Sequence, residues 1–535
     1  MFTTKPRLVI PKKVSAHVKR RAGTFYGFKG KDKEITTYIL MKLYQTLLLF
    51  VWAVPAAAQQ PEQTLTYRAE AAVTVSDGDY APLWLTSNRY GMTSNESKNA
   101  YLRAGIAWNK SLKHNWRIAA GLDLAGGKNL TSNFWLQQAY ADISWKKLTL
   151  SLGSKERSGF PLEKNEQLTS GWMVEGPNTR PVPQIRAEIR DYLDIPGLGH
   201  WLALKGHLAY GKFMDGNWQE DFVARGEMFT KDVLYHSKSL MLRLGNREKL
   251  PLEFEFGLLM ATQFGGDQYR KRADGSSEQT IDMPDGLKSY WTAFFPTAGG
   301  EDTPAGEQVN VEGNMLGSWN FALNYYCGDW TIKAQLEHYF EDHSQMFWEY
   351  GRWKDGQLGI EITPPRNRWI TSVLWEGLST KDSSGPILYD GFWGSFDDLQ
   401  MSGGDSYYNH YIYQAWQHHG LGMGNPLLAG PLYNNDGSIT FKSNRMKGQH
   451  IGLCGNPSEE WSWRVLATYA RHWGTYAAPL DKVRKQFNGL AEVTYNPQWA
   501  KGWGLRIAAA MDRGNYLGNS AGGMITLSKT GGFGL

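Results

Sequence analysis

The chain has 535 residues and a formal net charge of +5 at pH 7, with 59 glycines, 23 tryptophans and 27 tyrosines. This length exceeds that of one ordinary soluble domain, and a water-soluble enzyme rarely needs so much tryptophan. The positive charge is concentrated at the start: residues 1–40 hold ten Lys or Arg against two acids, and Lys42 adds one more, which leaves the rest of the chain at −4. We therefore expect no nucleic-acid partner.

Residues 41–58 have the three-part layout of a secretory signal peptide. One lysine is followed by an apolar core and by the small-residue exit Ala56 to Ala58. The apolar core is too short to span a bilayer as a stable helix. We expect residues 1–40 to be a basic extension from a wrongly assigned start, and residues 59–535 to form a single domain. The alternative is that residues 1–40 are a real basic arm.

Apolar and polar residues alternate after this leader, first in the segment 116–124. Neighbouring side chains of a strand point to opposite faces, so the pattern predicts one apolar and one polar face. The alternation recurs in segments that are each a candidate half of a hairpin: 139–145, 148–152, 185–190, 252–260 and 503–512. No stretch of about 20 apolar residues follows the leader, which argues against a helical membrane protein.

The alternating segments favour a transmembrane antiparallel β-barrel over a soluble β-sandwich or propeller, whose strands also alternate. Full charges occupy polar positions, such as Glu253 with Glu255 and Arg186 with Arg190, and aromatic residues gather at strand ends. A sandwich face open to water could carry the same charges, so the export signal decides between them. In lipid, a closed barrel is the β architecture that satisfies every backbone group. We predict an all-β protein of the bacterial outer membrane, in contact with its lipid.

The size of the barrel follows from the 477 residues after position 58. At about 25 to 30 residues per strand with its connection, they allow about 16 to 18 strands. A barrel this wide has an open lumen unless loops or short helices plug it, and we expect a plug. Residues 266–312 and 379–448 alternate little and are rich in Gly, Pro, Asp and Ser, which predicts loops or plug segments. The segment 519–535 is expected to close the chain as a strand, with Phe533 near its end.

The two cysteines, Cys327 and Cys454, are expected to be free thiols. Cys327 shares a strand face with Leu323 and Tyr325, whereas Cys454 shares one with His450. If the first face meets lipid and the second the lumen, the two cannot pair.

Motifs of catalysis are missing from the sequence. It contains no nucleophile elbow, Cys-x-x-Cys, His-Glu-x-x-His or phosphate loop. His418 and His419 are adjacent, and no third metal ligand is evident near them. The scattered serines and histidines do not single out the triad of an outer-membrane hydrolase. We predict no enzymatic activity, no cofactor and no metal.

A set of motifs carries a resemblance to a known family. The main one is Gly404-Asp405-Ser406-Tyr407-Tyr408-Asn409-His410, followed by Tyr413, Trp416, Gly420 and the run Gly424-Asn425-Pro426-Leu427-Leu428. The others are 153–156, 168–171, 178–185 and 441–445. Together, from about residue 65 to the C-terminus, they resemble the Wzi capsule-assembly family in its Bacteroidetes branch. The loops depart from those of proteobacterial members, so the glycan of those members is not carried over.

The resemblance implies an outer-membrane barrel of about 18 strands, plugged on its periplasmic side, that associates with capsular or exopolysaccharide at the cell surface. A sugar site needs aromatic platforms beside side chains that hydrogen-bond hydroxyl groups, and the segment 405–425 offers both. The candidate glycan-binding residues are Asp405, Tyr407, Tyr408, Asn409, His410, Trp416 and Asn425. The alternative is that the aromatic residues belong to the membrane girdle and that Asp405 caps a turn.

Charged residues at polar strand positions predict a second feature. Lys155 and Glu156 extend the strand that contains 148–152, and we expect them to form a lumenal charge network with other charges on polar faces. Those charges are Arg186, Glu188, Glu253 and Glu255. Because the mature chain carries −4, recognition of an acidic polymer would have to be local.

The leading hypothesis is a lectin-like, non-enzymatic protein for attachment or assembly of capsular or exopolysaccharide, with unknown partners in the export machinery. The alternative is an outer-membrane porin or solute channel, since the same wall and charged lumen suit one. An outer-membrane hydrolase is a third hypothesis.

Overall fold

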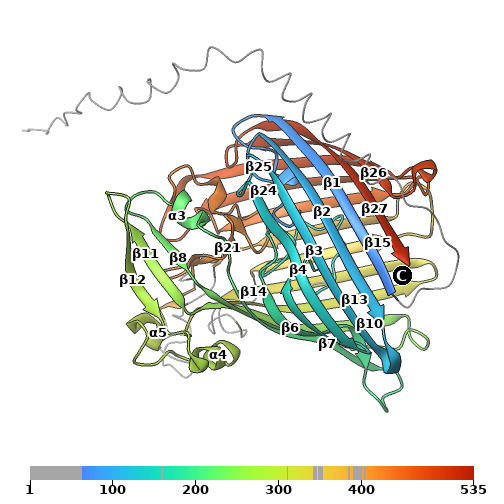
Figure 1. Cartoon of the computed structure of the whole chain (residues 1–535), viewed down its shortest axis with the longest axis horizontal. Helices are drawn as coiled ribbons and strands as arrows, with labels where there is room; N and C mark the ends of the chain where they lie inside the picture. Colours follow the sequence, from blue (N-terminus) through green and yellow to red (C-terminus); the bar gives the residue numbers. More distant parts are fainter. Residues whose placement is uncertain are drawn as a thin grey trace, which may run out of the picture. The chain divides into compact units, whose positions relative to one another are not determined.

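Eighteen strands form one antiparallel sheet that closes into a barrel (Figure 1). The first strand, β1 (Gln63–Asp77), pairs with β2 on one side and with the last strand, β27 (Ser520–Gly534), on the other, which closes the sheet. The computed structural model describes residues 63–157, 161–309, 311–341, 346, 354–383, 386–388, 401–402 and 405–534. The predicted fold is confirmed, and the strand number is the upper value expected from the sequence.

The other sixteen barrel strands follow the chain order. They are β2 (Lys98–Ser111), β3 (Trp116–Lys128), β4 (Phe134–Trp145), β5 (Leu148–Ser154), β6 (Gln184–Asp194), β7 (Leu202–Lys212), β9 (Leu234–Leu244), β10 (Leu252–Phe264), β13 (Asn314–Cys327), β14 (Trp330–Glu341), β15 (Gly356–Thr363), β16 (Ser372–Ser379), β23 (Met446–Gly455), β24 (Trp461–Gly474), β25 (Pro479–Tyr495) and β26 (Trp503–Gly514).

The alternation in the sequence becomes an apolar outside and a polar inside. In β5, Leu150 and Leu152 are exposed on the outer face, whereas Ser151 between them is fully buried. The same holds in β3, where Leu122 and Leu124 point outward and Asp123 inward. A side-chain period of two therefore separates a lipid-compatible face from a polar interior.

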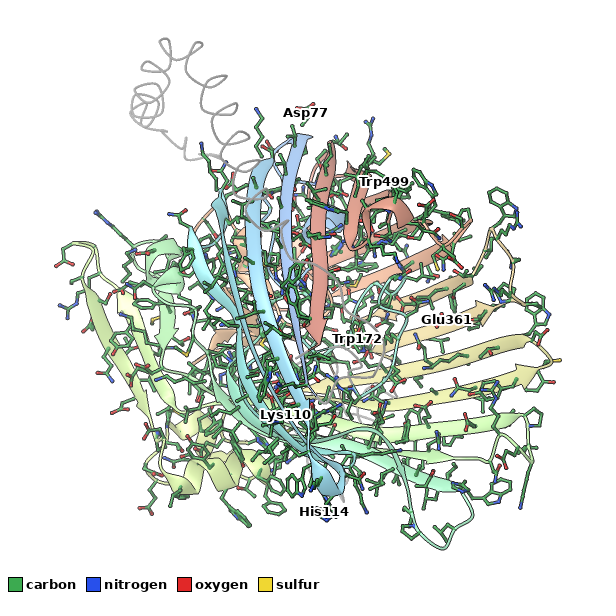
Figure 2. The ribbon with its side chains drawn as sticks, turned by 45° about the vertical axis from the view of Figure 1, so that its right-hand side comes forward. Asp77, Lys110, His114, Trp172, Glu361 and Trp499 are labelled. Carbon is green, nitrogen blue, oxygen red and sulfur yellow. The ribbon has the colours of Figure 1, made fainter. Side chains whose placement is uncertain are left out.

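The two ends of the barrel differ in their connections. Turns as short as Lys146–Lys147 lie at the end where β1 begins and β27 ends, while connections such as 155–183, 265–313 and 380–445 lie at the other. Asp77 and His114 mark the two ends in Figure 2. Outer-membrane barrels have their short turns on the periplasmic side. Seven exposed tryptophans form a girdle at the short-turn end: Trp116, Trp145, Trp201, Trp330, Trp369, Trp461 and Trp499.

Three of the long connections fold into the barrel and form what we call the plug, residues 81–95, 161–183 and 405–444. The plug contains α2 (Leu83–Thr86), the short pairs β19 (Asn409–His410) with β20 (Gln414–Ala415) and β21 (Gln417–His418) with β22 (Leu421–Gly422), and a 3₁₀ turn, Pro431–Tyr433. Its largest buried side chains include Trp172, Trp416, Tyr407, Tyr408 and Phe441. The prediction that 379–448 supplies a plug is confirmed for its described part, 405–444.

The other predicted loop segment, 266–312, does not enter the lumen. It contributes β11 (Gly266–Lys271) and β12 (Ser277–Met283) to a three-stranded sheet with β8 (Met228–Lys231), and it forms α4 (Leu287–Phe294) and α5 (Ala305–Val309). These elements lie together on the side of the barrel away from the C-terminus (Figure 1). The remaining elements are α3 (Trp218–Phe222), the pair β17 (Pro386–Leu388) with β18 (Met401–Ser402), and the 3₁₀ turns Lys113–Asn115 and Gln498–Ala500.

The structure also bears on the cysteines, the last strand and the membrane-spanning segments. Cys327 is exposed on the outer face and Cys454 is buried, and both are free, as predicted. Phe533 lies in the last strand and stacks on Tyr67, with ring centroids 5.7 Å apart. Among the described residues no helix is long and apolar enough to cross a membrane. The basic extension and the signal peptide lie outside the described residues.

The outer face generates a first prediction. Ile106 is exposed near the middle of β2, and Leu112 is exposed in the turn after it. Replacing Ile106 by Arg should lower the free energy of unfolding in lipid vesicles by about 2 to 4 kcal/mol, whereas Leu112→Arg, close to the interface, should cost about 1 kcal/mol or less. Urea unfolding of both variants in vesicles measures the difference. Equal effects at the two positions would contradict a lipid-facing belt.

Candidate functional site

The plug is attached to the wall by a buried ion pair. The ammonium of Lys164, in the plug, lies 2.6 Å from the carboxylate of Glu337 on β14, and both side chains are almost fully buried. Lys164 also donates to Gln357 and to the carbonyl of Gly171, at 2.8 and 3.0 Å. The second oxygen of Glu337 accepts the backbone N–H of Met173 at 2.9 Å. Every charge at this contact is thus paired and hydrogen-bonded, as burial requires.

Other inward-facing carboxylates hold plug backbone without a cation. Glu376 on β16 is fully buried and accepts the hydroxyls of Thr169 and Ser170 and the N–H of Ser170, all at 2.7 to 2.8 Å. Asp512 on β26 accepts the N–H of Leu83, at the start of α2, at 3.0 Å. Donated N–H and O–H groups stabilise a buried carboxylate as a cation would, so the wall and the plug form one hydrogen-bonded body.

The aromatic residues predicted to bind glycan lie inside the plug. Tyr407, Tyr408 and Trp416 are fully buried. The Tyr407 hydroxyl donates to Asp355 at 3.0 Å, the Tyr408 hydroxyl to the carbonyl of Met173, and the Trp416 indole N–H to the carbonyl of Val174 at 2.7 Å. In this arrangement the three rings offer no face to a sugar. Tyr408 and Trp416 join the plug segments 161–183 and 405–444, and Tyr407 joins 405–444 to Asp355, just before β15.

The polar members of the same prediction also have local partners. Asn409 donates to the carbonyl of Phe441 and accepts its N–H, at 3.0 and 2.7 Å, and the fully buried Asn425 accepts the N–H of Leu427. His410 lies 3.6 Å from Glu307 of α5, and burial lowers its pKa to about 3, so its imidazole is neutral at pH 7. Asp405 and His410 are half-buried. The motif that carries the family resemblance is therefore largely a packing motif of the plug.

The predicted lumenal charges all have partners, in three sets of contacts, and the first two sets adjoin one cavity through Lys155 and Arg186. Lys155 pairs with Asp142, and Glu156 accepts from Arg103 at 2.8 Å in the first set. Arg186 and Glu188 pair at 2.8 Å in the second. In the third, Glu253 accepts the Tyr326 hydroxyl at 2.7 Å and Glu255 accepts the Tyr192 hydroxyl at 2.7 Å. Alternation places these charges on the inner face, but it does not reveal which of them are neighbours.

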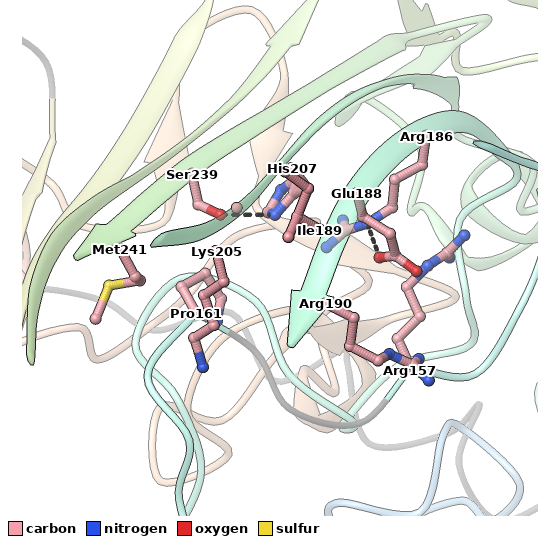
Figure 3. Close-up of a pocket in the computed structure, with 11 residues that line it drawn as sticks. Arg157, Pro161, Arg186, Glu188, Ile189, Arg190, Lys205, His207, Ser239 and Met241 are labelled. Atoms are coloured by element: carbon pink, nitrogen blue, oxygen red, sulfur yellow. Dashed lines mark hydrogen bonds and ion pairs between the residues drawn. The ribbon is translucent and has the colours of Figure 1, made fainter. Parts of the chain in front are cut away.

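Two adjoining cavities separate the connection after β5 from strands β6, β7 and β9. Arg157 and Arg186 line both. Figure 3 shows the first, which is lined by Arg157, Arg186, Arg190, Lys205 and one carboxylate, Glu188, that pairs with Arg186. The second adds Lys155 and Arg180 against Glu175. We call this pair of cavities the basic cavity. Six cations and two carboxylates line it, and two of the cations, Lys155 and Lys205, pair with Asp142 and Glu163 just outside the lining. The sequence analysis did not predict this site, because it looked for aromatic residues beside hydrogen-bonding side chains.

Arg157 is the most unusual residue of the basic cavity. Its side chain is buried, and its guanidinium bonds only neutral groups: the carbonyl of Lys155 at 3.2 Å and the hydroxyl of Ser151 at 3.3 Å. Its Nε has no hydrogen-bond partner, and no carboxylate among the described residues lies within ion-pair distance. Burial, and then the charge of Arg186, lower the pKa of Arg157 to about 10, so the group is still charged at neutral pH. The carboxylates of Glu188, Asp142 and Glu175 oppose this lowering without contacting the guanidinium. A buried cation that no carboxylate contacts directly is costly, and a bound anion would lower that cost.

The plug enters the barrel from the long-connection end. The resemblance implied a plug on the periplasmic side, whereas each described plug segment belongs to a connection at the opposite end. The plug residues 165–167 nevertheless extend toward the short-turn end of the lumen. Asn165 donates to Glu361 on β15 at 2.7 Å. Arg464, near the start of β24, donates to the carbonyl of Gln167 at 2.9 Å. The plug therefore enters from the end opposite to the expected one, although its contacts extend to strand residues near the short-turn end.

These features define a β-barrel of the outer-membrane type with a plugged lumen. No known protein family matches the sequence, and no curated protein matches it. Among solved structures, Wzi, an outer-membrane protein involved in group 1 capsule assembly in Escherichia coli and described as a carbohydrate-binding β-barrel, is similar with a TM-score of 0.50 and 12% identity, over 92% of this chain and 87% of Wzi.

Two other barrels are similar at lower scores. OccAB4 of Acinetobacter baumannii has a TM-score of 0.44 and 10% identity, over 89% of this chain and 99% of its own. OpdK of Pseudomonas aeruginosa, solved with vanillate, has a TM-score of 0.46 and 9% identity, over 88% and 99%. At such identities, the similarity to Wzi establishes the shared fold.

The buried ion pair generates a second prediction. Lys164→Met leaves Glu337 buried and unpaired, which should lower the free energy of unfolding in vesicles by about 3 to 5 kcal/mol. Lys288→Met breaks an exposed pair with Asp302 and should cost about 1 kcal/mol or less. Urea unfolding measures both effects. In planar bilayers the wild type should conduct little and Lys164→Met more; steady conduction by the wild type would contradict a lumen closed by the plug.

The basic cavity generates a third prediction. Arg157→Gln removes the unpaired cation and should weaken binding of glucuronate about 10- to 100-fold, the range expected for one charge-assisted hydrogen bond. Isothermal titration of the detergent-solubilised protein measures the affinity. Arg272→Gln, which removes a cation of the exposed hairpin between β11 and β12, is the matched control and should leave it unchanged. Equal affinity of wild type and Arg157→Gln would show that Arg157 does not hold the anion.

Proposed function

We propose that this protein is inserted in the bacterial outer membrane and holds, or helps to assemble, capsular or exopolysaccharide at the cell surface without catalysing a reaction. The observation that carries the proposal is a lumen occupied by a hydrogen-bonded plug beside a cavity with excess positive charge. A plug suits a binding protein better than a pore for diffusion, because it replaces the water that a pore needs. The fold shared with the carbohydrate-binding barrel Wzi supports the same function.

The basic cavity gives the proposal its chemistry. Guanidinium groups form paired, charge-assisted hydrogen bonds with carboxylates, and many surface polysaccharides carry uronic acids or other anionic groups. The mature chain has a net charge of −4, so the attraction has to come from a local cluster of cations. Arg157, Arg186 and Arg190 supply such a cluster on one side of the lumen.

A solute channel is the second candidate function. The two cavities share Arg157 and Arg186 and so follow one another along the wall, as a path for small anions would. The conductance of the wild-type barrel separates the two functions, since a path for solutes also passes ions.

The proposed function predicts a change in where the polymer is found. Deleting the gene in its native strain should leave the total amount of surface polysaccharide unchanged and move most of it from the cell pellet to the medium. The wild-type gene should restore attachment, and a gene carrying Arg157→Gln with Arg190→Gln should restore less than half of it. Polymer in pellet and supernatant, quantified by uronic-acid assay and immunoblot, measures the shift.

Two outcomes would count against the proposed function. If the deletion leaves the polymer attached, the protein has no role in attachment. If polymer synthesis itself stops, the protein acts earlier than we propose. The Arg272→Gln gene is the control for expression and should restore attachment fully.

A further inference from the structure

Helix α4 packs against the outer face of the barrel wall. Its Tyr290 ring lies 5.2 Å from the rings of Tyr210 on β7 and Phe264 on β10, and the Tyr210 hydroxyl donates to the Tyr290 carbonyl at 2.8 Å. Along β7, Ala203, Lys205 and Ala209 are buried on the inner face, so Tyr210 points outward. Phe264 continues the outer face of β10. The helix therefore covers the face of the wall that lipid covers elsewhere.

Two polar side chains of β9 lie beneath the helix. Lys238 donates to the carbonyl of Phe294, and its ammonium lies 4.6 Å from the centre of the Phe294 ring. His236 is fully buried, with its ring 5.9 Å from that of Phe294. Both residues point outward, because Tyr235 and Ser237 between and beside them face the lumen, where each contacts Glu175.

These polar residues lie at the depth of the lipid. Lys238 and His236 are six and eight residues along β9 from Leu244, which lies beside the tryptophan girdle at Trp201. At about 3.4 Å per residue and a strand tilt of about 40°, they lie roughly 15 to 20 Å above that girdle, within an apolar band of about 25 Å. A lysine exposed to lipid at that depth would destabilise the barrel, and α4 covers it.

Helix α4 exposes more large apolar residues than a helix on a water-soluble protein does. Ser289, Thr292 and Ala293 are buried. Tyr290 and Phe294 pack on the wall, and Lys288, paired with Asp302, is exposed beside the large apolar residues. Leu287 is 90% exposed, Trp291 66% and Phe295, directly after the helix, 47%. In water, residues of this size at spacings of four would turn toward the protein. Toward lipid, they continue the outer belt formed on β9 by Leu240.

We propose that α4 is a membrane-facing cover on the barrel, whose residues Leu287, Trp291 and Phe295 contact the lipid of the outer leaflet. The partner is lipid because the apolar face is continuous with the lipid-facing belt and because Trp and Phe are favoured at the border between acyl chains and headgroups. The proposal rests on insertion of the barrel in a membrane and is independent of what the lumen binds.

Site-directed labelling of the full chain tests the proposal. The parent is Cys327→Ser, with the buried Cys454 left in place. Leu287→Cys and, separately, Trp291→Cys are labelled with a fluorophore in phosphatidylcholine vesicles, with Leu240→Cys as the lipid-facing reference and Ala273→Cys, in the exposed turn after β11, as the aqueous reference. Doxyl-phosphatidylcholine quenches labels in lipid, and iodide quenches labels in water.

The expected result is quenching by doxyl lipid at 287 and 291 within twofold of that at 240, and quenching by iodide at least threefold weaker than at 273. Strong iodide quenching at 287 and 291, with lipid quenching at 240, would overturn the proposal for α4 and leave the barrel in the membrane. Iodide quenching at all four positions would overturn membrane insertion itself. Two labelled positions in α4 guard against a local effect of either substitution.

Discussion

Inward-facing carboxylates of the wall are the contact on which the rest of the structure depends. Irregular backbone buried in a barrel needs a partner for each N–H group, because neither a strand ladder nor free water supplies one. Glu337 and Glu376 meet this need for the plug segment 161–183, and Asp512 meets it for 81–95. Each carboxylate is in turn stabilised by the donors that it receives. The buried carboxylates of the wall and the buried N–H groups of the plug therefore satisfy one another, and removing either would leave the other without a hydrogen-bond partner.

The barrel could be predicted from the sequence because its signal is local. A period of two is visible in any six residues, and it places Leu150 outside and Ser151 inside without knowledge of their neighbours. The plug depends on contacts that no local pattern shows: Lys164 and Glu337 are 173 residues apart. The sequence predicted loops or plug segments at 266–312 and 379–448 alike, and only the second enters the plug. The segments 81–95 and 161–183 have no composition that distinguishes them from surface loops.

The predicted glycan site shows that composition alone does not separate a binding surface from a packed core. Tyr407, Tyr408 and Trp416 stand among Asn, Gln and Asp, and this composition suits both a sugar-binding surface and a packed polar core. Burial decides between the two, and burial depends on where the segment 161–183 lies. The basic cavity shows a related limit. Its cations are close in sequence, but 155–190 holds six cations and five acids, so a charge count over this window does not indicate the cavity.

The plug and α4 differ in which side chains they bury and which they expose. The plug buries aromatic residues among polar groups within a polar lumen, whereas α4 buries small and polar residues and exposes large apolar ones. Both arrangements follow from the medium that each surface meets. The lumen supplies hydrogen-bond partners, so the plug satisfies its polar groups there. Lipid supplies none, so α4 buries Ser289 and Thr292 and covers Lys238 and His236 of β9, while its exposed Lys288 is paired with Asp302.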